Sequence, residues 1–254
     1  MKLFGLSEIR AYSISLLMTT PSFSSQPAEP FTIGSFTDSQ EEIDTIMSEH
    51  FTPLYQNIFG KLGYNPKFVT NPHLRNVNLA RKGLIDAVIL YSTSQNLLDD
   101  SIYPDLLSVT NEPIYANKLG LAALNSKNIT IENEGDLRNY RIGITKSAPD
   151  MGNIFSIDNL AIESFQNFTT LFRMAKADRV DLIFTTDFML DILLSQTGID
   201  IEMEMVYPMG CVYTNMGISH QALGKENAES LREKLDMRLK ELKQEKPELF
   251  YITC

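Results

Sequence analysis

One structural unit occurs twice in this chain, and this repetition constrains the fold more than any other feature. The segment ARKGLIDAVILY, residues 80–91, is matched loosely by AKADRVDLIFTT, residues 175–186. Each copy begins with an Ala and a basic residue where a helix should end, passes through a short gap to an Asp, and enters a run typical of a buried strand. The chain is therefore expected to build the same helix-to-strand unit in two places.

The residues around both copies predict alternating strands and helices, which indicates an α/β fold with mostly parallel sheets. Apolar residues at helical spacing predict a long helix over 43–62, which Pro53 should kink or split. The other expected helices cover 72–82, 134–140, 164–177, 187–198 and 228–245. The expected strands are 31–36, 67–70, 85–91, 118–125, 141–145, 180–186 and 212–219.

Charge and composition exclude several classes of function. The chain carries 32 acidic against 22 basic residues and a formal charge of −10, so a nucleic acid is not an expected partner. The sequence contains no nucleophile elbow and no phosphate-binding loop. Its histidines, His50, His73 and His220, lie far apart, and the cysteines form no metal motif. We therefore expect no cofactor, no metal and no enzymatic activity.

The first 24 residues differ from the rest. Two basic residues, Lys2 and Arg10, precede the short apolar run 11–18. Ser22 and Ser24 then supply small residues for a cleavage site. The run is shorter than the roughly 20 residues that a membrane span needs. Residues 1–24 are therefore expected to be a signal peptide for export to the periplasm, and a disordered or surface-packed N-terminus is the alternative.

Two cysteines, Cys211 and Cys254, leave two alternatives open. In an exported protein they could form a disulfide, which would stabilise the fold by roughly 4 kcal/mol in the chain-entropy model. The other reading is one buried thiol and one residue at a frayed C-terminus.

Small polar residues follow the predicted strands in both halves. They lie at Ser35–Asp38, Tyr91–Ser94, Thr145–Ala148 and Thr185–Asp187, and most of them carry hydroxyl groups. Ligands of open α/β sheets bind beyond the carboxyl ends of the strands. These segments therefore predict a site that binds a small polar solute through hydrogen bonds.

The order of elements resembles the bilobed extracytoplasmic solute-binding proteins of family 3, which serve amino-acid ABC importers. The resemblance covers residues 31 to about 249 and rests on ARKGLIDAVI, EPIYANKLGLAAL, DLRNYRIGIT, RVDLIFTTD and VYTNMGISH in this order. It implies a two-lobed periplasmic binding protein fold of type 2, in which each lobe has its own mixed, mostly parallel sheet flanked by helices. Lobe 1 would cover 29–113 and 214–254, and lobe 2 would cover 114–213. Two crossing segments would form the hinge on which the lobes close.

The chain departs from the family pattern at several ligand positions. Leu97 stands where the Arg that grips a ligand carboxylate is expected, and KSAP replaces the usual Gly-Thr-Thr. Asp187 matches the position that pairs with the ligand's amino group. A standard α-amino acid is therefore doubtful, and a neutral or cationic solute is expected. The candidate ligand-binding residues are Phe36, Asp38, Tyr91, Ser92, Thr93, Lys146, Ser147, Thr186 and Asp187.

Each candidate has a structural alternative. Asp187 would also suit the cap of the following helix, and Tyr91 and Phe36 would also suit a core. Asp86 and Asp181 precede their strands, so a structural role is expected for both. The resulting hypothesis is a monomeric periplasmic protein that delivers a small polar solute to an ABC permease. The alternatives are a protein read by a membrane receptor and a dehydratase-like enzyme on the same scaffold.

Overall fold

The computed structural model of the protein describes residues 29–35, 51–93, 105–146, 155, 158–196 and 202–254. The expected signal peptide, 1–24, lies outside these residues. The strands are β1 (Glu29–Ser35), β2 (Tyr64–Thr70), β3 (Ala87–Ser92), β4 (Leu107–Val109), β5 (Tyr115–Leu124), β6 (Arg141–Thr145), β7 (Ala161–Phe165), β8 (Leu182–Thr186) and β9 (Met203–Ser219). The helices are α2 (Thr52–Gly60), α3 (His73–Arg81), α4 (Phe168–Lys176), α5 (Asp187–Gln196), α6 (His220–Leu223), α7 (Lys225–Glu245) and the 3-10 helices η2 (Asn125–Lys127), η3 (Glu134–Asn139) and η5 (Pro247–Leu249).

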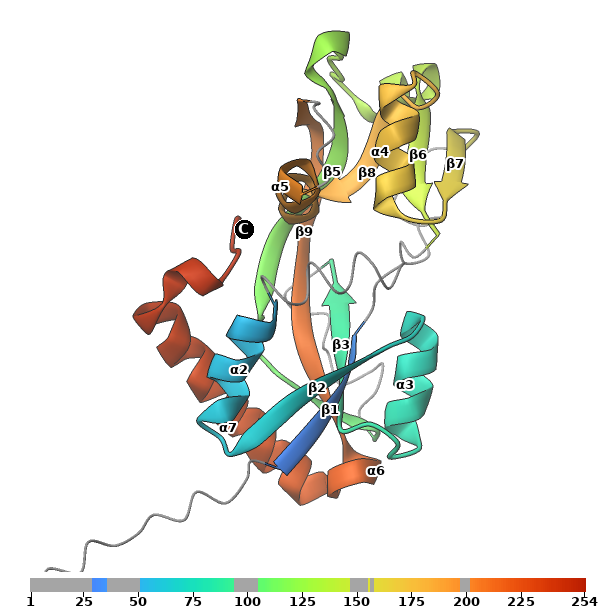
Figure 1. Ribbon diagram of the computed structural model, residues 1–254. Helices are drawn as coiled ribbons and strands as arrows, with labels where there is room; N and C mark the ends of the chain where they lie inside the picture. Colours follow the sequence, from blue (N-terminus) through green and yellow to red (C-terminus); the bar gives the residue numbers. More distant parts are fainter. Residues whose placement is uncertain (1–28, 36–50, 94–104, 147–154, 156–157, 197–201) are drawn as a thin grey trace, which may run out of the picture.

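These elements form two halves that are joined by long strands (Figure 1). One half contains β1, β2, β3 and β4 with α2, α3, α6 and α7, and the other contains β6, β7 and β8 with α4 and α5. Within each half the strands of the repeated unit pair in parallel, β1 with β2 and β3, and β6 with β7 and β8. The predicted two-unit α/β organisation is therefore confirmed.

The strands β5 and β9 run from one half into the other and pair antiparallel along their length. We expected a separate sheet in each half. Hydrogen bonding instead continues through a 9-stranded sheet, because β9 alone spans 17 residues. Eight strands follow the order β2-β1-β3-β9-β5-β8-β6-β7, and β4 pairs with β9 off this path. The register of β5 against β9 shifts at Gly120, where an added Cβ would lie 2.3 Å from the carbonyl oxygen of Tyr207. Glycine thus permits the close approach of the two crossing strands.

The first half has a core on each face of its sheet. On one face, α2 and α7 bury Leu54, Ile58, Leu235 and Leu239 against Phe31, Ile33, Ile89 and Met216. On the other face, α3 packs Val77 and Ala80 against Val88 and Leu90. Because neighbouring residues of a strand face opposite sides, odd-numbered residues of β3 face α2 and α7, whereas even-numbered residues face α3.

The second half packs α4 and α5 on its sheet. Leu171, Phe172 and Ala175 of α4 are buried against Ile183 and Phe165. Spacing of three and four residues along α4 places these side chains on one face, as an amphipathic helix requires. A further core on the opposite face contains Leu137, Ile142, Leu182 and Phe184.

Helix and strand boundaries differ in places from those predicted from the sequence. Residues 164–177 were expected to be one helix, but β7 occupies Ala161–Phe165 and α4 begins at Phe168. The reason is Asn167, whose side-chain oxygen accepts a hydrogen bond from the Thr170 amide at 2.8 Å and thereby caps the helix. The predicted kink or split of the helix 43–62 at Pro53 is not tested, because the described part, α2, begins at Thr52 and holds Pro53 in its first turn, where its missing N–H costs nothing. Residues 43–50 of that predicted helix lie outside the described residues.

Candidate functional site

At the amino ends of the parallel strands, the Asp residues of the repeated unit accept hydrogen bonds from the backbone of a neighbouring strand. Asp86 accepts a hydrogen bond from the amide of Thr32 in β1 at 2.7 Å. Asp181 accepts one from the amide of Arg141 in β6 at 3.0 Å. Each Asp therefore joins the strand that it precedes to the neighbouring parallel strand, which confirms the structural role expected for both residues and explains why the unit occurs twice.

Asp181 has additional charged partners. The Arg141 guanidinium donates to both of its oxygens at 2.8 Å, and the Lys127 ammonium lies 2.8 Å from it. Hydrogen bonds from Arg141 first, and then from Lys127, hold the pKa of Asp181 well below its usual range, although partial burial opposes the shift. Lys127 also pairs with Asp178 at 2.6 Å. The amino end of the second half is thus a closed network of charges.

The carboxyl ends of the same strands end in hydroxyl residues. Ser35 ends β1, Ser92 ends β3 and Thr145 ends β6, and their exposed fractions are 2%, 5% and 2%. In β8, Thr185 is also 2% exposed. Hydroxyl residues at or next to the strand ends of both halves are therefore buried.

At the carboxyl end of β8, two neighbouring side chains share the start of α5. The hydroxyl of Thr186 accepts a hydrogen bond from the Met189 amide at 3.2 Å, which is the geometry of a helix cap. The Asp187 carboxylate accepts from the amide of the next residue, Phe188, at 2.9 Å. The capping role that we considered for Asp187 thus falls to Thr186. The second oxygen of Asp187 has no partner among the residues that the structure describes.

The remaining sequence candidates are placed as follows. Tyr91 is 42% exposed, and Thr93 and Lys146 are exposed. Tyr91 and Ser92 are consecutive in β3, so their side chains face opposite sides of the sheet. Phe36, Asp38 and Ser147 lie outside the described residues, as does Leu97.

The chain's C-terminal segment lies beside the crossing strands, near α5 (Figure 1). Ala116 of β5 accepts a hydrogen bond from the Thr253 amide at 2.8 Å and donates its own amide to Tyr251 at 3.3 Å. The amide of Lys118 donates to the Thr253 hydroxyl at 3.0 Å. Residues 251–253 therefore extend the pair β5–β9 by a third strand-like segment where the two halves meet.

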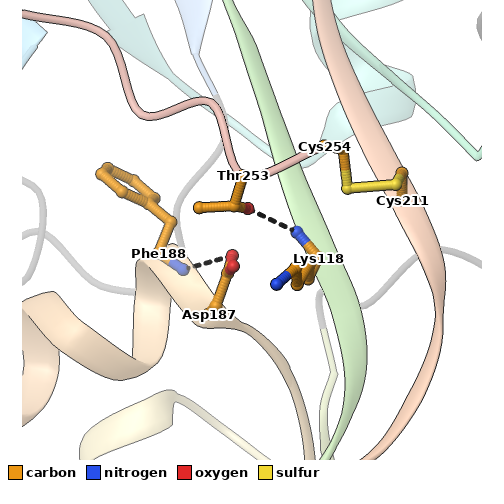
Figure 2. The surroundings of a disulfide bond; sticks show 6 residues. All are labelled: Lys118, Asp187, Phe188, Cys211, Thr253 and Cys254. Carbon is orange, nitrogen blue, oxygen red and sulfur yellow. Dashed lines mark hydrogen bonds between the residues drawn. A yellow bond between two sulfur atoms is a disulfide. The ribbon is translucent and has the colours of Figure 1, made fainter.

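A disulfide fixes this segment. Cys254 is bonded to Cys211 of β9, and their Cα atoms lie 6.2 Å apart, so the first of the two alternatives for the cysteines is the observed one. Figure 2 shows the disulfide together with Lys118 and Asp187, whose side chains lie on the same side of the crossing strands. The pair Leu119–Thr186 in the register of β5 and β8 places Lys118 and Asp187 next to each other.

Aromatic rings connect the two halves at this level. Phe188 of α5 stacks on Tyr115 of β5, with ring centroids 5.5 Å apart, and contacts Tyr251 at 5.0 Å. Phe51 contacts both Tyr115, at 5.3 Å, and Phe188, at 5.8 Å. The Tyr251 hydroxyl donates to Asp191 of α5, and burial together with this carboxylate raises the pKa of the phenol.

Within the described residues, no group of His, Cys, Asp and Glu side chains is arranged to hold a metal ion. No described helix combines the length and apolar composition that a bilayer span requires.

No protein-family model matches the chain, and no curated protein matches its sequence. Solved structures match over most of its length. The GluR0 ligand binding core in complex with L-glutamate has a TM-score of 0.63 and 12% identity, over 88% of this chain and 97% of that chain. The chain has the two-lobed fold of type 2 periplasmic binding proteins.

Further solved structures of this fold give similar values. An ABC uptake transporter substrate binding protein from Streptococcus pneumoniae with bound histidine has a TM-score of 0.62 and 17% identity, over 87% of this chain and 90% of that chain. Holo ArgBP from T. maritima has a TM-score of 0.58 and 14% identity, over 84% of this chain and 90% of that chain. At these identities the likeness establishes the fold.

Several buried polar residues on or near the crossing strands were not among the candidates chosen from the sequence. Asn117 on β5 is 5% exposed, and Tyr55 and Tyr115 are 0% and 3% exposed. Tyr55 lies in a helix with apolar neighbours and Tyr115 in an apolar strand, so their pattern indicated only a core. Ser35 lies in a recognised strand-end segment but was not selected as a candidate.

Proposed function

We propose that this protein is an exported solute-binding protein that captures a small polar solute between its two lobes and delivers it to an ABC importer. The lobes would comprise residues 29–113 with 214–254, and residues 114–213. The observation that carries the proposal is a set of buried hydroxyl residues in both halves: Ser35, Ser92 and Thr145 end their strands, and Thr185 precedes the last residue of β8. A solute between those strand ends would receive hydrogen bonds from both lobes.

The similar solved structures support this proposal. Those that name a ligand contain arginine, histidine or L-glutamate. The candidate contacts are Phe36, Asp38, Tyr91, Ser92, Thr93, Lys146, Ser147, Thr186 and Asp187. We assign the protein a binding function rather than an enzymatic one, and we expect it to act as a monomer in the periplasm with the importer's permease as its partner.

A thermal-shift screen tests the proposal. Amino acids, polyamines, organic acids and small peptides are added to the purified protein, and a ligand that binds only the folded state raises the melting temperature by an amount set by RT ln(1 + [L]/Kd). We expect at least one small polar solute to produce a shift that saturates with concentration. If none of these solutes shifts the melting temperature, the proposal is wrong.

Asp187 provides a sharper test of the site. Replacement of Asp187 by Ala removes one hydrogen-bond acceptor for the Phe188 amide, so the free energy of unfolding should fall by only about 1 kcal/mol. The shift given by a cationic solute that binds the wild type should disappear. A ligand-free protein that loses its folded state would instead assign Asp187 a structural role.

A further inference from the structure

Among the described residues, some buried side-chain atoms have no hydrogen-bond partner. They are the Ser35 hydroxyl, the Tyr55 hydroxyl, Nδ1 of His73 and Oδ1 of Asn117. A buried polar atom without a partner costs free energy, and folded proteins pair the large majority of such atoms. Each of these atoms therefore requires an explanation, and a role in binding a solute is one.

The strand register places Asn117 on the same face of the sheet as two tyrosines, Tyr91 and Tyr115. Thr214 of β9 pairs with Tyr91 of β3 on one side and with Tyr115 of β5 on the other, so these three side chains share a face. Asn117 follows Tyr115 by two residues and shares that face as well. Tyr55 of α2 packs in the same core as Tyr115.

Ser35 lies beside this group. Gly34 of β1 pairs with Val88 of β3, so the next residue, Ser35, lies next to Ile89. Ile89 belongs to the core of Tyr55 and precedes Tyr91 by two residues on the same face. We call Ser35, Tyr55, Tyr91, Tyr115 and Asn117 the polar cluster.

The phenols of the polar cluster influence one another's pKa. Burial raises the pKa of Tyr55, and the nearby Tyr115 and Tyr91 raise it further. Burial and Tyr91 also raise the pKa of Tyr115. Both groups therefore stay neutral at physiological pH and can donate or accept hydrogen bonds. No member of the cluster carries a charge.

These properties define the chemistry of a matching ligand group. Hydroxyls of Ser and Tyr both donate and accept, whereas Oδ1 of Asn117 only accepts. A carboxamide or a hydroxyl has both a donor and an acceptor and would satisfy them. A charged group would lose its hydration here without an opposite charge to compensate, which is costly. Tyr91, at 42% exposure, is where the cluster reaches solvent.

We propose that the polar cluster receives an uncharged hydrogen-bonding end of the solute, a carboxamide or hydroxyl, and so selects neutral polar solutes against charged ones. This inference rests on the proposed solute-binding function and specifies its substrate class. Ordered water satisfying the same atoms is the competing explanation.

The test compares L-glutamine with L-glutamate, which differ in one carboxamide, by calorimetry on the wild type and on Tyr55→Phe. Both probes carry the same charged α-amino and α-carboxylate groups, which the departures from the family pattern affect equally, so the difference in Kd reports only the carboxamide against the side-chain carboxylate. L-glutamine should bind at least about tenfold more tightly than L-glutamate. Tyr55→Phe removes only a hydroxyl without a described partner, so the melting temperature of the free protein should not fall. The Kd for L-glutamine should rise about tenfold, as expected for one lost hydrogen bond.

Tyr64→Phe is the matched control. Tyr64 is partly buried in the same core and its ring lies 5.1 Å from that of Phe31, yet it is not in the cluster, so the Kd should not change. The inference is overturned, with the proposed function intact, if L-glutamate or a cationic solute such as spermidine binds more tightly than L-glutamine. It is also overturned if Tyr55→Phe leaves the Kd unchanged, as water in the cluster would predict. If no screened solute binds, both proposals are wrong.

Discussion

The two ends of the same parallel strands are built differently. At the amino ends, Asp86 and Asp181 accept hydrogen bonds from the backbone of neighbouring strands, and Asp181 is also paired with Arg141 and Lys127. At the carboxyl ends, buried hydroxyls replace the charges, and that of Ser35 has no described partner. One end is completed by the chain itself, whereas at the other end the Ser35 hydroxyl retains hydrogen-bonding capacity for a solute.

This difference separates residues that stabilise the fold from residues that are available for binding. Changes at the amino ends should reduce the free energy of unfolding and leave the affinity of the folded protein alone. Changes at the carboxyl ends should reduce the affinity for the solute and leave the free energy of unfolding nearly unchanged. The crossing strands β5 and β9 connect the halves, so the C-terminal segment that covers them should belong to the stabilising class.

The largest expected effect comes from the disulfide of that segment. The bond joins residues 43 positions apart, so its loss should lower the free energy of unfolding by roughly 4 kcal/mol in the chain-entropy model. Denaturant unfolding of the Cys211→Ser, Cys254→Ser double variant measures the effect, with reduced wild type as the control. Solute affinity measured well below the melting temperature should persist. Unchanged stability would contradict the assignment of the segment to the stabilising class.

A smaller loss is expected at the amino end of the second half. Asp181→Ala leaves the Arg141 amide without its acceptor and leaves Arg141 and Lys127 with only the exposed Asp178, so the free energy of unfolding should fall by about 2–3 kcal/mol. Asp86→Ala, which removes one described backbone partner, should lower it by about 1 kcal/mol. Asp178→Asn is the control, because that side chain is 77% exposed and Asn tolerates the left-handed backbone of this position (φ 56°), so the change should matter little. Equal losses for Asp86 and Asp181 would contradict the importance given to the charged network.

The Asp181 carboxylate makes the free energy of unfolding depend on pH. The pKa of Asp181 is lower in the folded protein than in the unfolded chain, so its contribution is fully present above the unfolded pKa of about 4 and is lost as the pH falls toward the folded pKa. Between about pH 4 and pH 2, wild type should lose more stability than Asp181→Ala. Parallel curves for the two proteins would argue against this coupling.

The smallest expected effect on stability lies at the carboxyl end of β1. Ser35→Ala removes a buried hydroxyl that has no described partner, so the free energy of unfolding should stay within about 0.5 kcal/mol of wild type or rise. The affinity for a neutral polar solute should fall. A large loss of stability would mean that the hydroxyl is already used by the chain, and the contrast between the two strand ends would not hold for lobe 1.

Much of this organisation follows from sequence pattern. The repeated unit predicted the parallel strands, because an apolar run after a helix and an Asp has few other uses. Thr186 and Asp187 were selected as candidate site residues from their place after such a run. Tyr55 and Asn117 could not be recognised, because an aromatic residue in an amphipathic helix and a single Asn in a strand are ordinary. Their relation depends on the pairing of β5, β9 and β3 across about 60 residues of sequence or more, which no local pattern encodes.

The central claim is that a solute binds between the carboxyl ends of strands from both lobes. Amide hydrogen exchange, measured with and without the solute that gives the largest thermal shift, tests it most directly. The account predicts added protection after β1, β3, β6 and β8, around Ser35, Ser92, Thr145 and Thr186, and unchanged exchange around Asp86 and Asp181. Protection confined to one lobe, or centred on the amino ends, would contradict it.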